Sequence, residues 1–193
     1  GKVSSEAQAI RTKIARLEAL ESVLAEKLSG LNTARSQRDK ILDELEDIRA
    51  EKFSEREAVA NKLNEKLGPR IQVTVERAGH SAPYAAMIVN SLRGSGLHYN
   101  DLSRSLAEAV SPRELAEFVE NGDARSLAAA ANIPVDRADK CIANLADEDI
   151  VAHLYTLQVD DRVDFFLLDK SQPKPISQLS TGQRCTVVLP IIL

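Results

Sequence analysis

The stretch best suited to chemistry runs from Leu179 to Arg184 and reads L-S-T-G-Q-R. Ser180 followed three residues later by Gln183 fits a capping box, in which both side chains satisfy backbone N–H groups at a helix start. A helix that opens on Ser-x-Gly also presents bare N–H groups, a hydroxyl and the positive end of its dipole, which together suit an anion. The stretch therefore has two interpretations, a capped C-terminal helix or a turn that senses a nucleotide.

No other set of residues predicts a catalytic or metal site. The histidines His80, His98 and His153 are widely spaced and lack Cys or carboxylate companions at ligand spacing, so no metal site is expected. The turn at residues 94–96 does not match the phosphate loop G-x-x-x-x-G-K-[ST]. Cys185 follows the motif, where a helix dipole can lower a thiol pKa, but its apolar neighbours favour an inert, buried thiol.

Composition indicates long helices rather than an aromatic-rich enzyme core, because only 4% of the 193 residues are aromatic and 28% are charged. The net charge of -4 gives no overall drive toward nucleic acid or an anionic membrane, although it allows a local basic patch. Cys141 and Cys185 lie far apart, so a disulfide framework is not expected and a reducing cytoplasm is favoured.

The ends of the sequence predict no membrane contact and no secretion. The first residues lack the apolar region of a secretory signal, and the longest apolar run, residues 187–193, is too short to span a bilayer. The sequence starts without Met and stops in the middle of an apolar pattern, which indicates a piece of a longer chain.

Residues 3–66 are predicted to form a long helix with the a/d seam of a coiled coil. A solvated helix of a bundle would need the same residue types but not so regular a repeat. Gly30 leaves two possibilities: an antiparallel hairpin of arms 3–28 and 33–66, or one continuous helix whose partner lies outside the chain. The heptad phase continues past Gly30 and favours the continuous helix. The seam residues are Val3, Ala7, Ile10, Ile14, Leu17, Leu24, Leu28 and Leu31.

The remaining residues predict an α+β fold that is mostly α. Gly68-Pro69 ends the long helix, and the alternation of residues 71–76 predicts a strand with one buried face. The motif follows a polar, Pro-rich loop at residues 170–175. Helices are expected near 82–93, 100–109, 112–120, 123–131 and 135–146, and further strands at 153–159 and 163–168 around a turn at Asp160-Asp161.

This order of elements, ending in P-I-S-Q-L-S-T-G-Q-R-C-T-V-V-L-P-I-I-L, resembles the C-terminal half of the ATPase head in SMC-type and DNA-repair ABC ATPases. The residues around the motif are most similar to bacterial coiled-coil ATPases, some of which are fused to a PHP-type phosphoesterase domain. The resemblance implies a coiled-coil arm at 1–67 and a partial head at 68–193. The head would comprise a strand at 71–77, a helical lobe at 81–148, strands at 150–169 and the signature turn and helix at 176–193.

The resemblance also implies that the L-S-T-G-Q motif is the ABC signature, which contacts the γ-phosphate of ATP bound to an opposite head. Ser180 would donate its hydroxyl and Gly182 its backbone N–H, while Gln183 and Arg184 would support the turn and nearby phosphate or interface contacts. ATP and Mg²⁺ would then occupy a site shared by two heads of a homodimer. The implied ATP-binding residues are Ser180, Thr181, Gly182, Gln183 and Arg184.

The phosphate loop and the acidic Walker B strand do not occur in the sequence, so this chain alone is not expected to hydrolyse ATP. The family further implies a nucleic-acid partner and a role in DNA repair, chromosome maintenance or defence. One alternative is a non-catalytic coiled-coil assembly module. Another is a helix-turn-helix module at residues 126–146, but Asp136, Arg137, Asp139 and Lys140 cancel in charge, whereas phosphate contacts need surplus cations.

Overall fold

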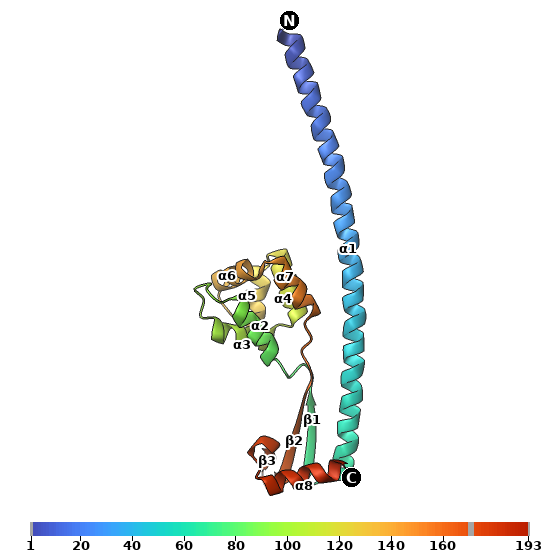
Figure 1. Cartoon of the computed structure of the whole chain (residues 1–193), viewed down its shortest axis with the longest axis vertical. Coiled ribbons are helices and arrows are strands. Elements are labelled where there is room, and N and C mark those ends of the chain that lie inside the picture. Colours follow the sequence, from blue (N-terminus) through green and yellow to red (C-terminus); the bar gives the residue numbers. More distant parts are fainter. Residues whose placement is uncertain (1, 170–171, 193) are drawn as a thin grey trace. The chain divides into compact units, whose positions relative to one another are not determined.

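The computed structural model describes residues 2–169 and 172–192 (Figure 1). The described residues are mostly helical, with one small three-stranded antiparallel sheet. The chain divides into an N-terminal unit, Gly1–Ala50, and a C-terminal unit, Glu51–Leu193. The α+β, mostly α prediction is therefore confirmed at the level of secondary structure.

Helix α1 (Lys2–Leu67) is continuous and passes through Gly30 without a break. A single glycine costs about 1 kcal/mol in a helix interior, which the strong helix formers around it outweigh. The continuous helix is thus confirmed, and the hairpin alternative is wrong. Every side chain from Ser4 to Ala34 is exposed, so the apolar seam of the N-terminal unit lies on its surface. Pairing of that seam with another helix stays a prediction.

The sheet of the C-terminal unit has the strand order β1-β2-β3, where β1 is Ile71–Glu76, β2 is Arg162–Asp169 and β3 is Gln172–Pro175. Strand β1 runs antiparallel to β2, with Ile71 opposite Leu167, and β2 runs antiparallel to β3. The prediction of a strand at 71–76 is confirmed, including its buried face.

The core of the sheet is closed by the 3₁₀ turn η1 (Ile176–Gln178) and helix α8 (Thr181–Ile192). Ile71, Leu179 and Val187 are buried together. Further apolar side chains from α1, β2, η1 and α8 pack against this cluster, and they bury the inward side of α8. These are Leu67, Phe165, Leu167, Ile176 and Ile191.

Six helices form a lobe inserted between β1 and β2 (Figure 1). The five predicted helices are confirmed to within about two residues at each end. Their buried leucines, among them Leu106, Leu115 and Leu127, form a core of their own. The helices are α2 (Ala82–Ser91), α3 (Tyr99–Ala109), α4 (Pro112–Asn121), α5 (Ala124–Ala131), α6 (Val135–Leu145) and α7 (Glu148–Thr156).

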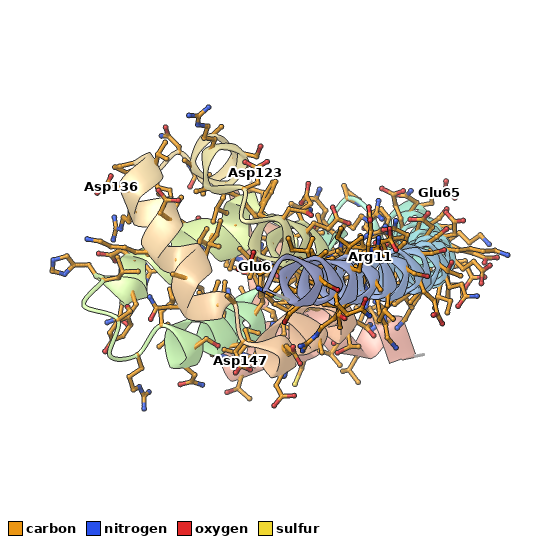
Figure 2. All side chains as sticks on the ribbon, turned by 90° about the horizontal axis from the view of Figure 1, so that it is seen from above. Glu6, Arg11, Glu65, Asp123, Asp136 and Asp147 are labelled. Atoms are coloured by element: carbon orange, nitrogen blue, oxygen red, sulfur yellow. The ribbon has the colours of Figure 1, made fainter. Side chains whose placement is uncertain are left out.

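Short polar residues begin and end the helices of the lobe. Ser111 and Glu114 form a capping box at the start of α4, and Gly122 ends that helix in the left-handed conformation with φ of 64°. Asp123 accepts the N–H of Ser126 and caps α5. A hydrogen bond with the Ser126 side chain, followed by this backbone bond, keeps the pKa of the Asp123 carboxyl below its ordinary value. Asp123 and Asp147, the caps of α5 and α7, are labelled in Figure 2.

The predicted strand at 153–159 is wrong, because most of these residues belong to α7. Asp147 accepts the N–H groups of Asp149 and Ile150 and so starts a helix. Ile150 and Leu154 then lie one turn apart on one face, and this spacing outweighs the short alternation that suggested a strand. Asp160-Asp161 accordingly connects the lobe to β2 and does not join two strands.

The predicted loop at 170–175 is also wrong over its last four residues, which form β3; residues 170 and 171 lie outside the described ranges. Pro173 and Pro175 are compatible with this strand because β3 is at the edge of the sheet.

Candidate functional site

The candidate site is the start of α8, namely Ser180 just before the helix and its first turn up to Arg184, and we call residues 180–184 the α8 turn. Its position is fixed by Leu179, which is only 4% exposed and lies in the sheet core with Val187. Because both of these side chains point into the core, the polar residues between them face solvent. All five residues of the α8 turn are exposed.

Ser180 and Gln183 form the capping box expected from the sequence. The Ser180 N–H donates to Gln183 Oε1 over 3.1 Å, and the Gln183 N–H donates to Ser180 Oγ over 3.4 Å. The Ser180 hydroxyl also lies 3.2 Å from Gln183 Oε1 and donates to it. The 3.4 Å and 3.2 Å distances are longer than is usual for hydrogen bonds of these kinds, so the box is weak. It confirms the capped-helix geometry.

The capping box does not provide acceptors for two backbone N–H groups of the α8 turn. The N–H groups of Thr181 and Gly182 have no hydrogen-bond partner within residues 2–169 and 172–192. They belong to the first turn of α8, where N–H groups lack helical acceptors and carry the positive end of the helix dipole. Gln183 Oε1 meanwhile occupies an acceptor position at this helix end. An anionic oxygen would find two ready donors here and would compete with the Gln183 amide for those of Ser180.

Gly182 is not required by the fold of this chain. A Cβ atom built on Gly182 meets no atom within 4 Å, and the backbone is not left-handed there. Gly122 is different, since its left-handed backbone favours glycine. The absence of a side chain at Gly182 therefore leaves the end of α8 open to close approach by another molecule.

Arg184 holds the turn that precedes α8. Its guanidinium donates from Nε to the carbonyl oxygen of Leu179 over 3.0 Å and from Nη2 to that of Ser177 over 3.2 Å. These bonds link the α8 turn to the end of η1. The hydrogen bonds of Arg184 thus agree with its expected role of supporting the turn. Contact of this side chain with phosphate stays a prediction.

The thiol next to the α8 turn differs from expectation. Cys185 is exposed, so the prediction of a buried thiol is wrong. The reason is the helical spacing, which turns Val187 toward the core in place of Cys185. Cys141 is buried in the lobe, where burial raises its pKa to about 12. Both cysteines are free thiols.

The apolar end of α8 is only partly covered. Val187 is buried, whereas Val188 is 38% and Leu189 is 54% exposed. Apolar surface is therefore exposed at these two residues.

The helix-turn-helix candidate consists of α5 and α6, which pack against each other around Asn132 in the left-handed conformation. Arg137 donates to the carbonyl oxygen of His98 over 3.0 Å, so one of the two cations of α6 also has a structural contact. DNA binding by this pair remains the alternative stated above.

The histidines lie on separate parts of the C-terminal unit. His80 follows β1, His98 precedes α3 and His153 belongs to α7. Over residues 2–169 and 172–192, no three His, Cys, Asp or Glu residues gather as they would around a metal ion.

No protein-family model, curated protein or solved structure matches this chain. None of the helices in the described ranges contains an apolar stretch long enough to cross a bilayer.

Proposed function

We propose that this chain is the signature-bearing half of the head of a coiled-coil ABC-type ATPase. In this proposal the α8 turn contacts the γ-phosphate of ATP held by an opposite head, and ATP thereby joins two heads. The observation that carries the proposal is Gly182, an exposed glycine that neither the backbone nor the packing of this chain requires. A phosphate that approaches the backbone N–H of Gly182 closely would require it.

The residues of the α8 turn suit one side of a triphosphate. The Thr181 and Gly182 N–H groups lack protein acceptors within the described residues, and the helix dipole favours an anion at the same place. A γ-phosphate oxygen would replace Gln183 Oε1 as the acceptor for the Ser180 N–H and hydroxyl groups. In this proposal the capping box forms when no nucleotide is bound. Its hydrogen bonds are long, so replacing them with hydrogen bonds to phosphate costs little free energy.

The Mg²⁺ that accompanies ATP would be held by residues outside this half of the site. The described residues offer no cluster of carboxylates for it, and the sequence contains no phosphate loop with its lysine. When bound, Mg²⁺ would neutralise charge on the β- and γ-phosphates. This chain would supply only the donors on the other side of the γ-phosphate.

The decisive experiment measures ATP-dependent dimerisation of the full-length protein that contains these residues. Ser180→Arg is expected to leave ATP binding intact, since the proposal places the nucleotide pocket on the opposite head, and to abolish dimerisation. Gly182→Ala adds a methyl group in open space. It should leave the fold intact but weaken dimerisation about tenfold or more, because the methyl group would separate the backbone N–H from phosphate.

Gly30→Ala is the matched control, because Gly30 is also a helical glycine with open space at its Cβ position. It should leave ATP-dependent dimerisation unchanged. If Ser180→Arg and Gly182→Ala also leave dimerisation unchanged, the signature assignment is wrong. The α8 turn would then only cap a helix, as in a non-catalytic assembly module.

The proposal includes a nucleic acid as partner and a role in DNA repair, chromosome maintenance or defence. Both rest on the family resemblance of the motif and of the element order.

A further inference from the structure

The N-terminal unit carries a long apolar seam that nothing in that unit covers. The exposed fractions of its side chains lie between 46% at Leu31 and 65% at Leu17. A helix with such a row of exposed aliphatic side chains is suited to pairing with another helix. We call this row the α1 seam; it consists of Ile10, Ile14, Leu17, Leu24, Leu28 and Leu31.

The charged residues beside the α1 seam specify which helix fits it. With Ile14 at heptad position a and Leu17 at d, the flanking positions e and g hold charges of both signs. Side chains at these positions set the partner and the orientation of a coiled coil. In an antiparallel pair, e faces e and g faces g. Position e holds the charged residues Arg11 and Glu18 besides Ala25, and position g holds Glu6, Lys13 and Lys27 besides Leu20.

We propose that the α1 seam pairs with the α1 seam of a second copy of this chain in an antiparallel coiled coil. In the register that we infer, Ile14 of each copy lies beside Leu17 of the other. This register places Arg11 opposite Glu18 of the second copy. Because the pair has two-fold symmetry, the same contact occurs twice.

The g positions select the same register. Glu6 then faces Lys27 of the second copy, again twice by symmetry. A shift by one heptad in one direction would place Glu18 against Glu18 and Lys13 against Lys27. A shift in the other direction would place Arg11 against Arg11 and Lys13 against Lys13. Only the inferred register joins opposite charges at both flanks. Figure 2 looks down α1 and labels Glu6 and Arg11, two of the residues that this register uses.

The a positions favour the antiparallel orientation over a parallel one. A parallel pair in register would also join opposite charges, for example Glu6 with Arg11. It would, however, place Glu21 against Glu21 at an a position in the middle of the seam, where two like charges would be partly desolvated. In the antiparallel pair Glu21 lies beside Ile10 instead. This contact lies outside the α8 turn and needs no nucleotide, so it goes beyond the proposed function.

The test measures dimerisation of the 193-residue chain without nucleotide, by sedimentation equilibrium at low salt. Glu18→Arg and Arg11→Glu are each expected to raise the dimer Kd about tenfold, because two symmetric attractions become repulsions. The chain that carries both substitutions should regain the Kd of the unchanged chain. An equimolar mixture of the two single variants should form mixed dimers with that same Kd.

The double variant separates the two orientations. In a parallel pair it would dimerise worse than either single variant, because the e residues would then face like charges at g on both sides. Matched controls are Glu26→Arg and Arg16→Glu, which make the same charge changes at positions f and c, away from the seam, and should leave the Kd unchanged. Far-UV circular dichroism checks that every variant keeps its helical content.

Three results would overturn the proposal. One is a chain that stays monomeric at about 100 μM, a concentration at which even weak specific pairing is populated. Another is a dimer that ignores both single variants, as would be seen if the copies met through the apolar end of α8. The third is a double variant that fails to regain the Kd of the unchanged chain.

Discussion

Tyr84 is a tyrosine in the core of the helical lobe. Its side chain is buried, 1% exposed, and its hydroxyl has no hydrogen-bond partner within the described residues. An unsatisfied buried hydroxyl costs free energy of folding. We therefore expect Tyr84→Phe to raise the free energy of unfolding by about 1 kcal/mol in urea titrations.

Tyr155→Phe is the matched control, because the Tyr155 hydroxyl donates to Glu120 over 2.8 Å. Its removal should lower the free energy of unfolding by about 1 kcal/mol. Equal effects of the two substitutions would show that the Tyr84 hydroxyl has a partner.

Tyr84 also predicts how stability changes in alkali. Burial, followed by the nearby Cys141 and Glu114, raises the pKa of Tyr84 far above its ordinary value of 10.0. The unfolded chain can thus lose this proton above pH 10 while the folded chain keeps it. Stability from this residue is present below pH 10 and should fall by about 1.4 kcal/mol per pH unit above it. In Tyr84→Phe the decline between pH 10 and 11 should be shallower by about that amount, as measured by urea unfolding at each pH.

Asn64 joins two elements of the C-terminal unit, α1 and β1. Its side-chain nitrogen donates to the Val73 carbonyl over 2.9 Å, and its oxygen accepts the Val73 N–H over 2.7 Å. The amide thus pairs with the outer edge of β1 as a neighbouring strand would. Because Val73 is only 3% exposed, water cannot readily replace these bonds.

We expect Asn64→Ala to lower the free energy of unfolding by about 2 kcal/mol, since two backbone groups of a buried residue lose their partners. Urea unfolding followed by tyrosine fluorescence measures this change. Asn61→Ala is the control, because Asn61 is an exposed asparagine on the same helix and should change stability by less than about 0.5 kcal/mol. If the two substitutions cost the same, the Asn64 amide does not hold β1.

The sequence predicted those elements whose signals are local. The heptads of α1, the alternation of β1 and the caps of α4 and α5 all lie within a few residues of the structure that they specify. Contacts between residues far apart in the sequence have no such local signal. Asp161 accepts both the Arg56 guanidinium over 2.7 Å and the Ala78 N–H over 3.1 Å, and neither contact is visible in local spacing. β3 was missed for the same reason, since its residues become a strand only by pairing with β2.

The candidate site was predictable in part. The Ser180 and Gln183 spacing specified the capping box, because a helix cap depends on residues three apart. The exposure of Cys185 and the open space at Gly182 depend on which side of α8 meets the sheet. That choice is made by Leu179 and Val187 together with residues more than 100 positions earlier, such as Ile71.

At the scale of the whole molecule, the two units should lose structure by different routes on heating. From Ser4 to Ala34 every side chain of the N-terminal unit is exposed, so this stretch has no buried core to make its melting sharp. Helices of this kind melt gradually. The C-terminal unit buries the apolar side chains of its sheet and of its helical lobe and should unfold in one cooperative step.

The tyrosines make this difference measurable, because Tyr84, Tyr99 and Tyr155 all belong to the C-terminal unit. Near-UV circular dichroism should therefore report one sharp transition, while the far-UV signal at 222 nm begins to fall at lower temperature. If the α1 seam pairs two copies, higher protein concentration will move the early far-UV phase upward and leave the tyrosine transition in place. Far-UV and near-UV curves that coincide at every concentration would contradict the division into two units, because a single cooperative unit cannot lose its helices before its tyrosine environment.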